Sequence, residues 1–314
     1  MARNHIDHKH IQEFAERVVN LKRDDAKKYR DQVNRLRTKL DELIKENPDF
    51  ELQKMLLSGS LAKHTALKNI NDADVAVYVS SAPQDVGDLT VWLAGKLRKA
   101  FPNFNHDQVV IQNYSVKVEF RGTGLDVDVV PIYKKDKDDW GELVSQEDGR
   151  RLLTNITLHK AFIKKRRVNY PSYAQIVRLL KWWIKTQKEL DSDFKFKSFM
   201  VELILAKLFD DRKIAEDAYP EILLCFFDYI ARTNFGEEIY FTDYTSKPKF
   251  CNDPIRVFDP VNPSNNLGRK YNSYDRDRIV TKALNAGDAI EAALKAPTKE
   301  LTIYYWKKIF GPSF

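Results

Sequence analysis

One apolar stripe runs through the N-terminal segment of the chain, residues 8–46. It is made by Tyr29, Val33, Leu36, Leu40 and Leu43, which follow one another at three- and four-residue steps. This spacing puts all of them on one face of a helix. The pattern therefore predicts a long amphipathic helix over 8–46, with a break near Asp24.

Short apolar stretches that favour strands follow this helix. Residues 72–80 alternate and are rich in valine, which predicts a strand, and further strands are predicted at 53–57, 109–111, 115–121 and 125–133. Within this region a brief helix is expected after Ser58-Gly59-Ser60, and residues 86–101 have the spacing of an amphipathic helix. The first half of the chain is therefore predicted to be a sheet with helices packed on it.

The spacing of apolar residues becomes mainly helical after about residue 169. Helical spacing predicts helices at 173–187, 197–209, 221–232 and 273–294. We therefore expect an α+β protein with a sheet domain at 1–168 and a helical domain at 169–314. We expect the two domains to pack tightly, with a cleft between them.

Composition narrows the classes of function. The 314 residues contain no apolar run near the ~18 needed to cross a membrane, so no membrane association is expected. The start of the chain lacks the apolar core of a signal peptide, which favours a cytoplasmic protein. The net charge of +7 suits nucleic acid or triphosphates as partners, although a mildly basic surface explains it equally well. The basic run 164–167 is either a nucleic-acid contact or a solvated helix end.

Two acidic segments carry the candidate chemistry. Asp72 and Asp74 are two residues apart on one predicted strand, and Asp126 and Asp128 are two apart on another. Residues at this spacing point to the same face of a strand. Such a carboxylate set suits Mg²⁺, with Mn²⁺ as an alternative, and two ions about 3.5–4 Å apart could act on a hydroxyl and a leaving pyrophosphate.

A Gly-Ser turn stands upstream of the first acidic pair. Gly59 permits close backbone approach, while Ser60 and the backbone amides offer hydrogen-bond donors to phosphate oxygens. Taken alone, Asp72 and Asp74 are typical of solvated acids at a strand start. Asp126 and Asp128 lie among valines, where an unpaired charge is costly, so a functional reading is favoured for the whole set.

The order Gly-Ser, Asp-x-Asp and then hydrophobic-Asp-hydrophobic resembles the polymerase-beta-like nucleotidyltransferase superfamily. The resemblance implies a mixed sheet with helices on one side, cupped by a helical domain. In that pattern Asp72 and Asp74 match the first two metal ligands and Asp128 matches the third. Asp126 shares the face of Asp128 and is the rival for the third position.

Motifs in the second half narrow the resemblance to oligoadenylate synthases and cyclic GMP-AMP synthase. Arg178–Trp183 is similar to the helix that supplies a triphosphate-binding lysine, here Lys181. Ser198 and Phe199 match a helix start where the hydroxyl meets phosphate and the ring stacks on a base. The loop 259–266 resembles an Asp-Pro-x-Asp/Asn-Pro-x-x-Asn motif of this group and ends on Asn266, the remaining expected nucleotide contact. A purely turn-forming role explains Asn266 equally well.

Together these motifs resemble the bacterial cGAS/DncV-like nucleotidyltransferases of antiphage signalling, most closely the clade paired with HORMA-domain regulators. The resemblance implies that nucleoside triphosphates, chiefly ATP, are joined into a cyclic oligonucleotide, with cyclic tri-adenylate as the expected product. It implies a HORMA-domain activator, with duplex DNA or RNA on the basic surface as a second input. One departure is His64, which stands where the family often has glycine before the threonine.

Two other functions share parts of this pattern. A template-free RNA-modifying transferase, of the tRNA-terminal or poly(A)-adding type, would use the same metal site. A nucleic-acid sensor with weak catalysis would keep the fold and the basic charge. Retention of the aspartates together with Gly59 and Ser60 argues against a relic site.

Overall fold

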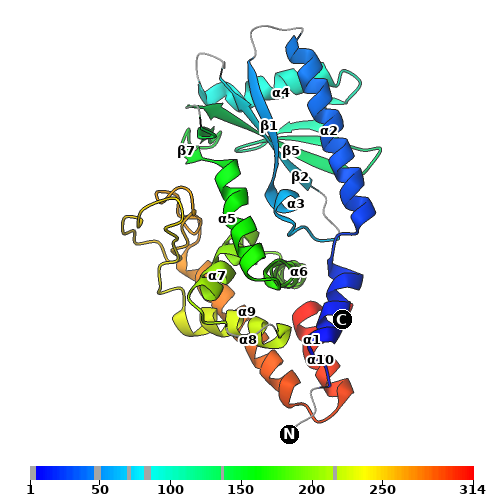
Figure 1. Ribbon diagram of the computed structural model, residues 1–314, viewed down its shortest axis with the longest axis vertical. Coiled ribbons are helices and arrows are strands. Elements are labelled where there is room, and N and C mark those ends of the chain that lie inside the picture. Colours follow the sequence, from blue (N-terminus) through cyan, green and yellow to red (C-terminus); the bar gives the residue numbers. More distant parts are fainter. Residues whose placement is uncertain (1–4, 46–50, 69–71, 81–85, 136–137, 215–217) are drawn as a thin grey trace. The chain divides into compact units, whose positions relative to one another are not determined.

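A computed structural model gives the fold of the chain (Figure 1). It describes residues 5–45, 51–68, 72–80, 86–135, 138–214 and 218–314, without the side chains of Ile44, Lys45 and Asp72. The described chain forms two compact units, one from Leu21 to Ile163 and one that joins the segment before Leu21 to Lys164–Phe314. The first holds the sheet and the second is helical, which is the predicted α+β fold.

In the described part of the sheet unit there are seven strands. Their bounds are β1 Leu52–Ser58, β2 Asp72–Val79, β3 Val109–Ile111, β4 Val116–Phe120, β5 Leu125–Lys134, β6 Gly141–Val144 and β7 Arg151–Thr154. Five of them lie in the order β1-β2-β5-β4-β3, while β6 pairs with β5 and β7 with β6. The β2–β5 pair is parallel and the other pairs are antiparallel, so the sheet is mixed, as predicted.

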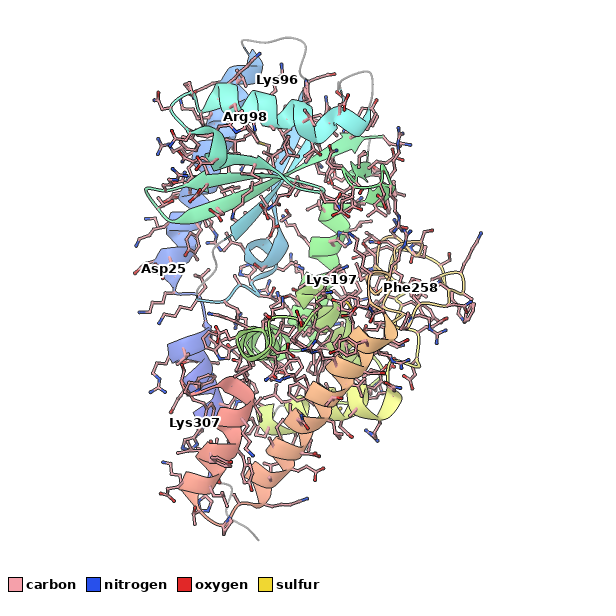
Figure 2. All side chains as sticks on the ribbon, turned by 180° about the vertical axis from the view of Figure 1, so that it is seen from behind. Asp25, Lys96, Arg98, Lys197, Phe258 and Lys307 are labelled. Atoms are coloured by element: carbon pink, nitrogen blue, oxygen red, sulfur yellow. The ribbon has the colours of Figure 1, made fainter. Side chains whose placement is uncertain are left out.

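The two faces of this sheet differ in polarity. One face packs its valines against helices α2 (Arg23–Lys45) and α4 (Leu89–Ala100), which lie against the sheet in Figure 1. Val33, Leu36 and Leu40 of α2 are buried there, so the predicted apolar stripe does contact the core. Arg98 of α4, labelled in Figure 2, also donates to the Val109 carbonyl of β3 at 2.9 Å.

The opposite face carries the aspartates at one end and a smaller apolar cluster further along. Ala76, Tyr78 and Ile132 are the buried members of that cluster, and all three occupy even-numbered positions like the aspartates. Because side chains alternate along a strand, the valine core on the other face fixes which residues appear here.

The remaining helices of the sheet unit are short, except the last one. They are α3 Gly59–Lys63, the 3₁₀ turns η2 Val86–Asp88 and η3 His106–Gln108, and α5 Ile156–Asn169, within which the division between units falls. The helical unit contains α1 His8–Phe14, the π-helical turn η1 Ala15–Val19, α6 Tyr173–Leu190, α7 Ser198–Asp210, α8 Tyr219–Thr233, α9 Ser273–Lys295 and α10 Lys299–Phe310.

The predicted helix over 8–46 is interrupted. Residues 20–22 are not helical, so α1 and η1 are separate from α2. Asn20 explains the break: its side chain donates to Gln175 at 2.9 Å and accepts from Arg178 Nε at 2.8 Å, both in the helical unit. The prediction kept 1–168 together. In the structure the residues before Leu21 group with the helices, and the later division falls after Ile163.

Four elements had no clear signal in the sequence. Strands β6 and β7 are four residues each, too short to show a period. Helix α5 contains the basic run Lys164–Arg167, and these charges weaken the apolar periodicity to which the buried Phe162 and Ile163 contribute. Helix α10 is rich in aromatic and β-branched residues, which lowers its helical propensity.

The basic run in α5 proves to be partly structural. Arg166 is only 3% exposed, and its Nη2 lies 2.5 Å from Asp210 Oδ2 and 2.8 Å from Asp243 Oδ2. Lys165 also reaches Asp243, at 2.9 Å. Burial alone would raise the pKa of Asp243, but the hydrogen bonds from Arg166 and Lys165 outweigh it and lower that pKa. Arg166 is therefore an internal residue of the helical unit rather than part of a nucleic-acid patch.

Replacing Arg166 should destabilise the protein. Arg166→Met leaves Asp210 and Asp243 facing each other without their shared cation, which we expect to cost about 3–5 kcal/mol of unfolding free energy. Urea unfolding monitored by circular dichroism measures this, with Arg167→Met as the matched control.

Because the pKa of Asp243 is lowered in the fold, the contribution of its carboxylate to the stability of the protein is complete at neutral pH and is lost as pH falls through that lowered pKa. The difference between wild type and Asp243→Asn should therefore close in acid; a difference that stays constant would contradict this account.

Candidate active site

The turn from β1 into α3 places backbone against a carboxylate. Gly59 has φ +60°, in the left-handed region that glycine tolerates. A Cβ atom built on Gly59 would lie 1.6 Å from Asp74 Oδ2 and 2.4 Å from its Cγ. The register of β1 and β2 sets this proximity, because Ser58 lies opposite Asp74. Any side chain added at residue 59 would therefore overlap the carboxylate of Asp74 in its present position.

The parallel pair β2–β5 brings the two acidic segments side by side. Asp72 is in register with Asp126, and Asp74 with Asp128. Registered residues of neighbouring strands share a face, so the backbone places all four on the face opposite the valine core. Asp74 and Asp128 are half-buried, and Oδ1 of Asp128 is buried. The side chain of Asp72 lies outside the described residues.

Asp126 and Asp128 differ in their surroundings. Lys117 of β4 is in register with Asp128, yet its ammonium forms an ion pair with Oδ2 of Asp126. The hydrogen bond to Asp126 is the main cause of a raised pKa of Lys117; burial opposes it, and the charges of Asp126 and Asp128 add to it. Asp126 is thus held by a cation, which favours Asp128 as the third carboxylate.

Carboxylates from adjacent strands form a donor set that fits divalent metal. They are hard oxygen ligands, and the Gly59 backbone keeps space clear beside Asp74. Among the residues whose side chains the structure describes, no group of three or more histidine, cysteine, aspartate or glutamate residues is arranged to hold a metal ion.

His64 ends helix α3 with φ 59° and ψ 33°. This is the left-handed conformation that glycine adopts most readily, although histidine also occurs there. His64 therefore takes up, at the end of α3, a backbone conformation that a glycine would also allow. Ser60 accepts from the Thr65 amide at 2.9 Å through its carbonyl, which closes the turn.

The predicted triphosphate lysine is buried in the helical unit. Lys181 of α6 is 7% exposed and its ammonium lies 2.6 Å from Oε1 of Glu202, which is 1% exposed. Ser198, at the start of α7, stands one helical turn before Glu202 and is exposed. Phe199 is half-buried. Ser198 therefore belongs to α7, and Lys181 is paired to the same helix through Glu202.

The side chain of Asn266 is used to build its own loop. Its Oδ1 accepts from the Val257 and Gly268 amides at 3.0 Å each. Its Nδ2 donates to Asp253 and to the Ile255 carbonyl at 2.8 Å each. These four bonds fill the capacity of an amide side chain. The structure therefore gives Asn266 the turn-forming role and leaves its side chain without spare groups for the predicted nucleotide contact.

Sequence reasoning did not single out two residues of these clusters, Lys117 and Glu202. Lys117 had a weak signal, because it is a polar residue on the alternating strand 115–121. Glu202 had none, since a lone glutamate within the apolar segment of α7 gives no partner until the helices are placed.

The fold and the carboxylate face together define a nucleotidyltransferase. Residues 7–162 match the family described as the Second Messenger Oligonucleotide or Dinucleotide Synthetase domain. The chain belongs to this family, the bacterial cGAS/DncV-like nucleotidyltransferases, and is most like the clade associated with HORMA-domain regulators. It is an enzyme of the oligonucleotide synthetase class. Nucleotidyltransferases of this family generally use divalent metal ions.

Named relatives cover the whole chain. The chain is 51% identical to the cyclic AMP-AMP-AMP synthase of Escherichia coli strain MS 115-1, over 100% of this chain and 99% of that protein. It is 31% identical to a CBASS oligonucleotide cyclase CdnC of E. coli strain KTE188, over 97% and 96% of the two chains.

Solved structures agree with this assignment. The structure of E. coli MS115-1 CdnC with ATP matches with a TM-score of 0.90 at 50% identity, over 99% of both chains. The same protein in complex with HORMA-deltaN matches with a TM-score of 0.89 at 49% identity, over 99% of this chain and 98% of that one. Within the described part of the chain, no helix has the length and apolar character needed to cross a membrane.

The contact between Gly59 and Asp74 leads to a prediction. Gly59→Ala should displace the Asp74 carboxylate, because the new methyl group would overlap it, and kcat should fall by at least about a hundredfold. The variant should still fold, because a strained left-handed alanine lowers the unfolding free energy by only about 1–2 kcal/mol. Gly124→Ala is the matched control, since Gly124 also has positive φ but nothing within 4 Å of an added Cβ. Equal activity in the two variants would show that the approach of Gly59 to Asp74 is unimportant.

Proposed function

We propose that this enzyme joins ATP molecules into a cyclic oligonucleotide, cyclic tri-adenylate, and releases pyrophosphate. The main support for this reaction is the strand register, which sets Asp74 beside Asp128. The backbone of Gly59 lies against Asp74 at the same place. The identity of the product is supported by the 51% identical relative, which is named for it.

The chemistry joins a ribose hydroxyl of one nucleotide to the α-phosphorus of another. The new oxygen–phosphorus bond forms as the bond to pyrophosphate breaks, and the hydroxyl proton leaves to solvent. Asp72, Asp74 and Asp128 would hold two Mg²⁺ ions, with Mn²⁺ as a substitute. When bound, such ions stabilise charge on the attacking oxygen and on the leaving pyrophosphate. The enzyme's own part is to hold the reacting groups in line.

Residues outside the carboxylate set would bind the triphosphate. The amides of Gly59 and Ser60 open α3 and offer donors to phosphate oxygens. Lys181 would supply a point charge and Ser198 a hydroxyl donor, while Phe199 would stack on a base. Because Lys181 already pairs with Glu202, its ammonium is held in one position. Phosphate would have to share it with the glutamate.

A HORMA-domain protein is the proposed activator. Support comes from the relative solved with HORMA-deltaN, which is about half identical over almost the whole chain. The net charge of +7 supports duplex DNA or RNA as a second input. The proposed setting is the cytoplasm, in antiphage defence, as the CBASS cyclase among the relatives suggests.

The carboxylate set can be tested residue by residue. Asp72→Asn, Asp74→Asn and Asp128→Asn should each lower kcat by at least about a thousandfold, because each removes a charged ligand. Asp126→Asn should retain turnover at saturating metal, since its carboxylate is already paired with Lys117. Pyrophosphate release across a Mg²⁺ titration measures this, and thermal unfolding checks that all four variants fold. An inactive Asp126→Asn beside an active Asp128→Asn would reverse the assignment.

The product can be tested directly. Incubation with ATP and Mg²⁺, with and without a HORMA-domain protein, should give a short product that resists phosphatase and has the mass of three adenylates. We expect its formation to depend on the partner. A ladder of linear products would contradict cyclisation, extension of added RNA would indicate an RNA-modifying transferase, and full activity without a partner would contradict activation. Asp74→Asn provides the negative control.

A further inference from the structure

Lys117 stands on β4 next to both candidates for the third carboxylate. It is in register with Asp128, while its ammonium pairs with Asp126. We propose that Lys117 is a positioning residue that holds Asp126 out of the metal-binding set, so that Asp128 alone completes it. The inference rests on the proposed function for its catalytic consequence, but its effect on metal binding can be measured separately.

The strand geometry alone does not choose between the two aspartates. Asp126 and Asp128 lie on the same face of β5, each in register with one aspartate of β2. A carboxylate two residues along a strand is about 7 Å away, within the space that a pair of bound ions and their waters can bridge. A device beyond strand register is therefore needed to make one of them a ligand and not the other.

The ion pair supplies this device. The Lys117 and Asp126 side chains are 38% and 18% exposed, so their contact is partly shielded from water. An ammonium group bound to a carboxylate oxygen occupies one of the roughly four lone-pair directions of that carboxylate and offsets its charge. Asp126 therefore attracts a metal ion less strongly than it would without Lys117, whereas Lys117 acts on Asp128 through its charge.

Charge balance gives Lys117 a second effect. Strands β2 and β5 bring four aspartates to one end of a sheet face, with Glu119 of β4 in register with Asp126. Glu119 has a cation of its own in Arg121, at 3.6 Å. Lys117 therefore reduces the negative charge beside the metal ligands by one. Without it the site should bind divalent ions more tightly and in more than one arrangement.

The test is a double-mutant cycle read by metal binding. Mn²⁺ binding is measured by electron paramagnetic resonance for wild type, Lys117→Met, Lys117→Arg, Asp126→Asn and the Lys117→Met/Asp126→Asn double variant. Thermal unfolding with EDTA and with Mn²⁺ gives a second readout, and pyrophosphate release gives kcat and KM for ATP. Arg121→Met, which removes another ion-paired cation close to β4, is the matched control.

The expected results differ in sign between the single variants. Lys117→Met should bind Mn²⁺ about tenfold more tightly and lose about tenfold in kcat, because the freed Asp126 competes for the ion. Its melting temperature in EDTA should fall and recover on addition of Mn²⁺ more than that of wild type. Asp126→Asn should bind Mn²⁺ more weakly, because Lys117 then turns to Asp128. The double variant should return to within about threefold of wild type in both quantities. Lys117→Arg and Arg121→Met should stay near wild type.

Two outcomes would overturn the inference. If Lys117→Met raises KM for ATP and the double variant does not recover, Lys117 binds phosphate instead. If Lys117→Met behaves like Arg121→Met, the ion pair has no role in selecting the ligand. An error in the proposed product can be told apart from an error in this inference, because the Mn²⁺ and unfolding measurements do not depend on which nucleotide is made.

Discussion

Mutual repulsion of carboxylates is the constraint around which the sheet unit is built. The parallel register of β2 and β5 forces Asp72, Asp74, Asp126 and Asp128 onto one end of one face. The strands cannot rotate the acids away, because their odd-numbered valines are fully buried against α2 and α4. A slip of one residue would place charges in that core, at a cost far above the repulsion that it relieved. The rigid apolar face thus maintains a cluster of negative charge that cations can neutralise.

The backbone around this cluster is adapted to it. Gly59 lies so close to Asp74 that only a hydrogen atom fits at its Cβ position. The same turn begins α3, whose first amides are the proposed phosphate donors, while the proposed metal ligands lie on β2 and β5. His64 then closes α3 in a left-handed conformation. The strand–turn–helix element therefore contributes the backbone beside Asp74, and the parallel strand pair contributes the aspartates themselves.

The helical unit places several of its charges inside. Arg166 is buried between two aspartates, and Lys181 is buried against Glu202. Each internal pair removes at least one anion together with its cation, so the net charge of +7 is still carried by the rest of the chain. For the proposed triphosphate role of Lys181, the pair with Glu202 would keep the ammonium in position before substrate arrives, which would lower the entropy lost on binding phosphate.

The sequence by itself determined the α+β class, the strands that carry the aspartates and the turn at Gly59, because these depend on local period and on residue chemistry. It also determined the family, through motifs that are contiguous in the chain. Only the tertiary structure decided which residues become partners. Asn20 ends the first helical segment by hydrogen bonding to α6, and Lys117 pairs with Asp126 on the neighbouring strand. The amide of Asn266 hydrogen-bonds within its own loop. The first joins residues far apart in sequence, the second depends on the register of two neighbouring strands, and the third depends on a loop with no regular period. No local pattern could specify them, since each pairing exists only once the chain has been brought together.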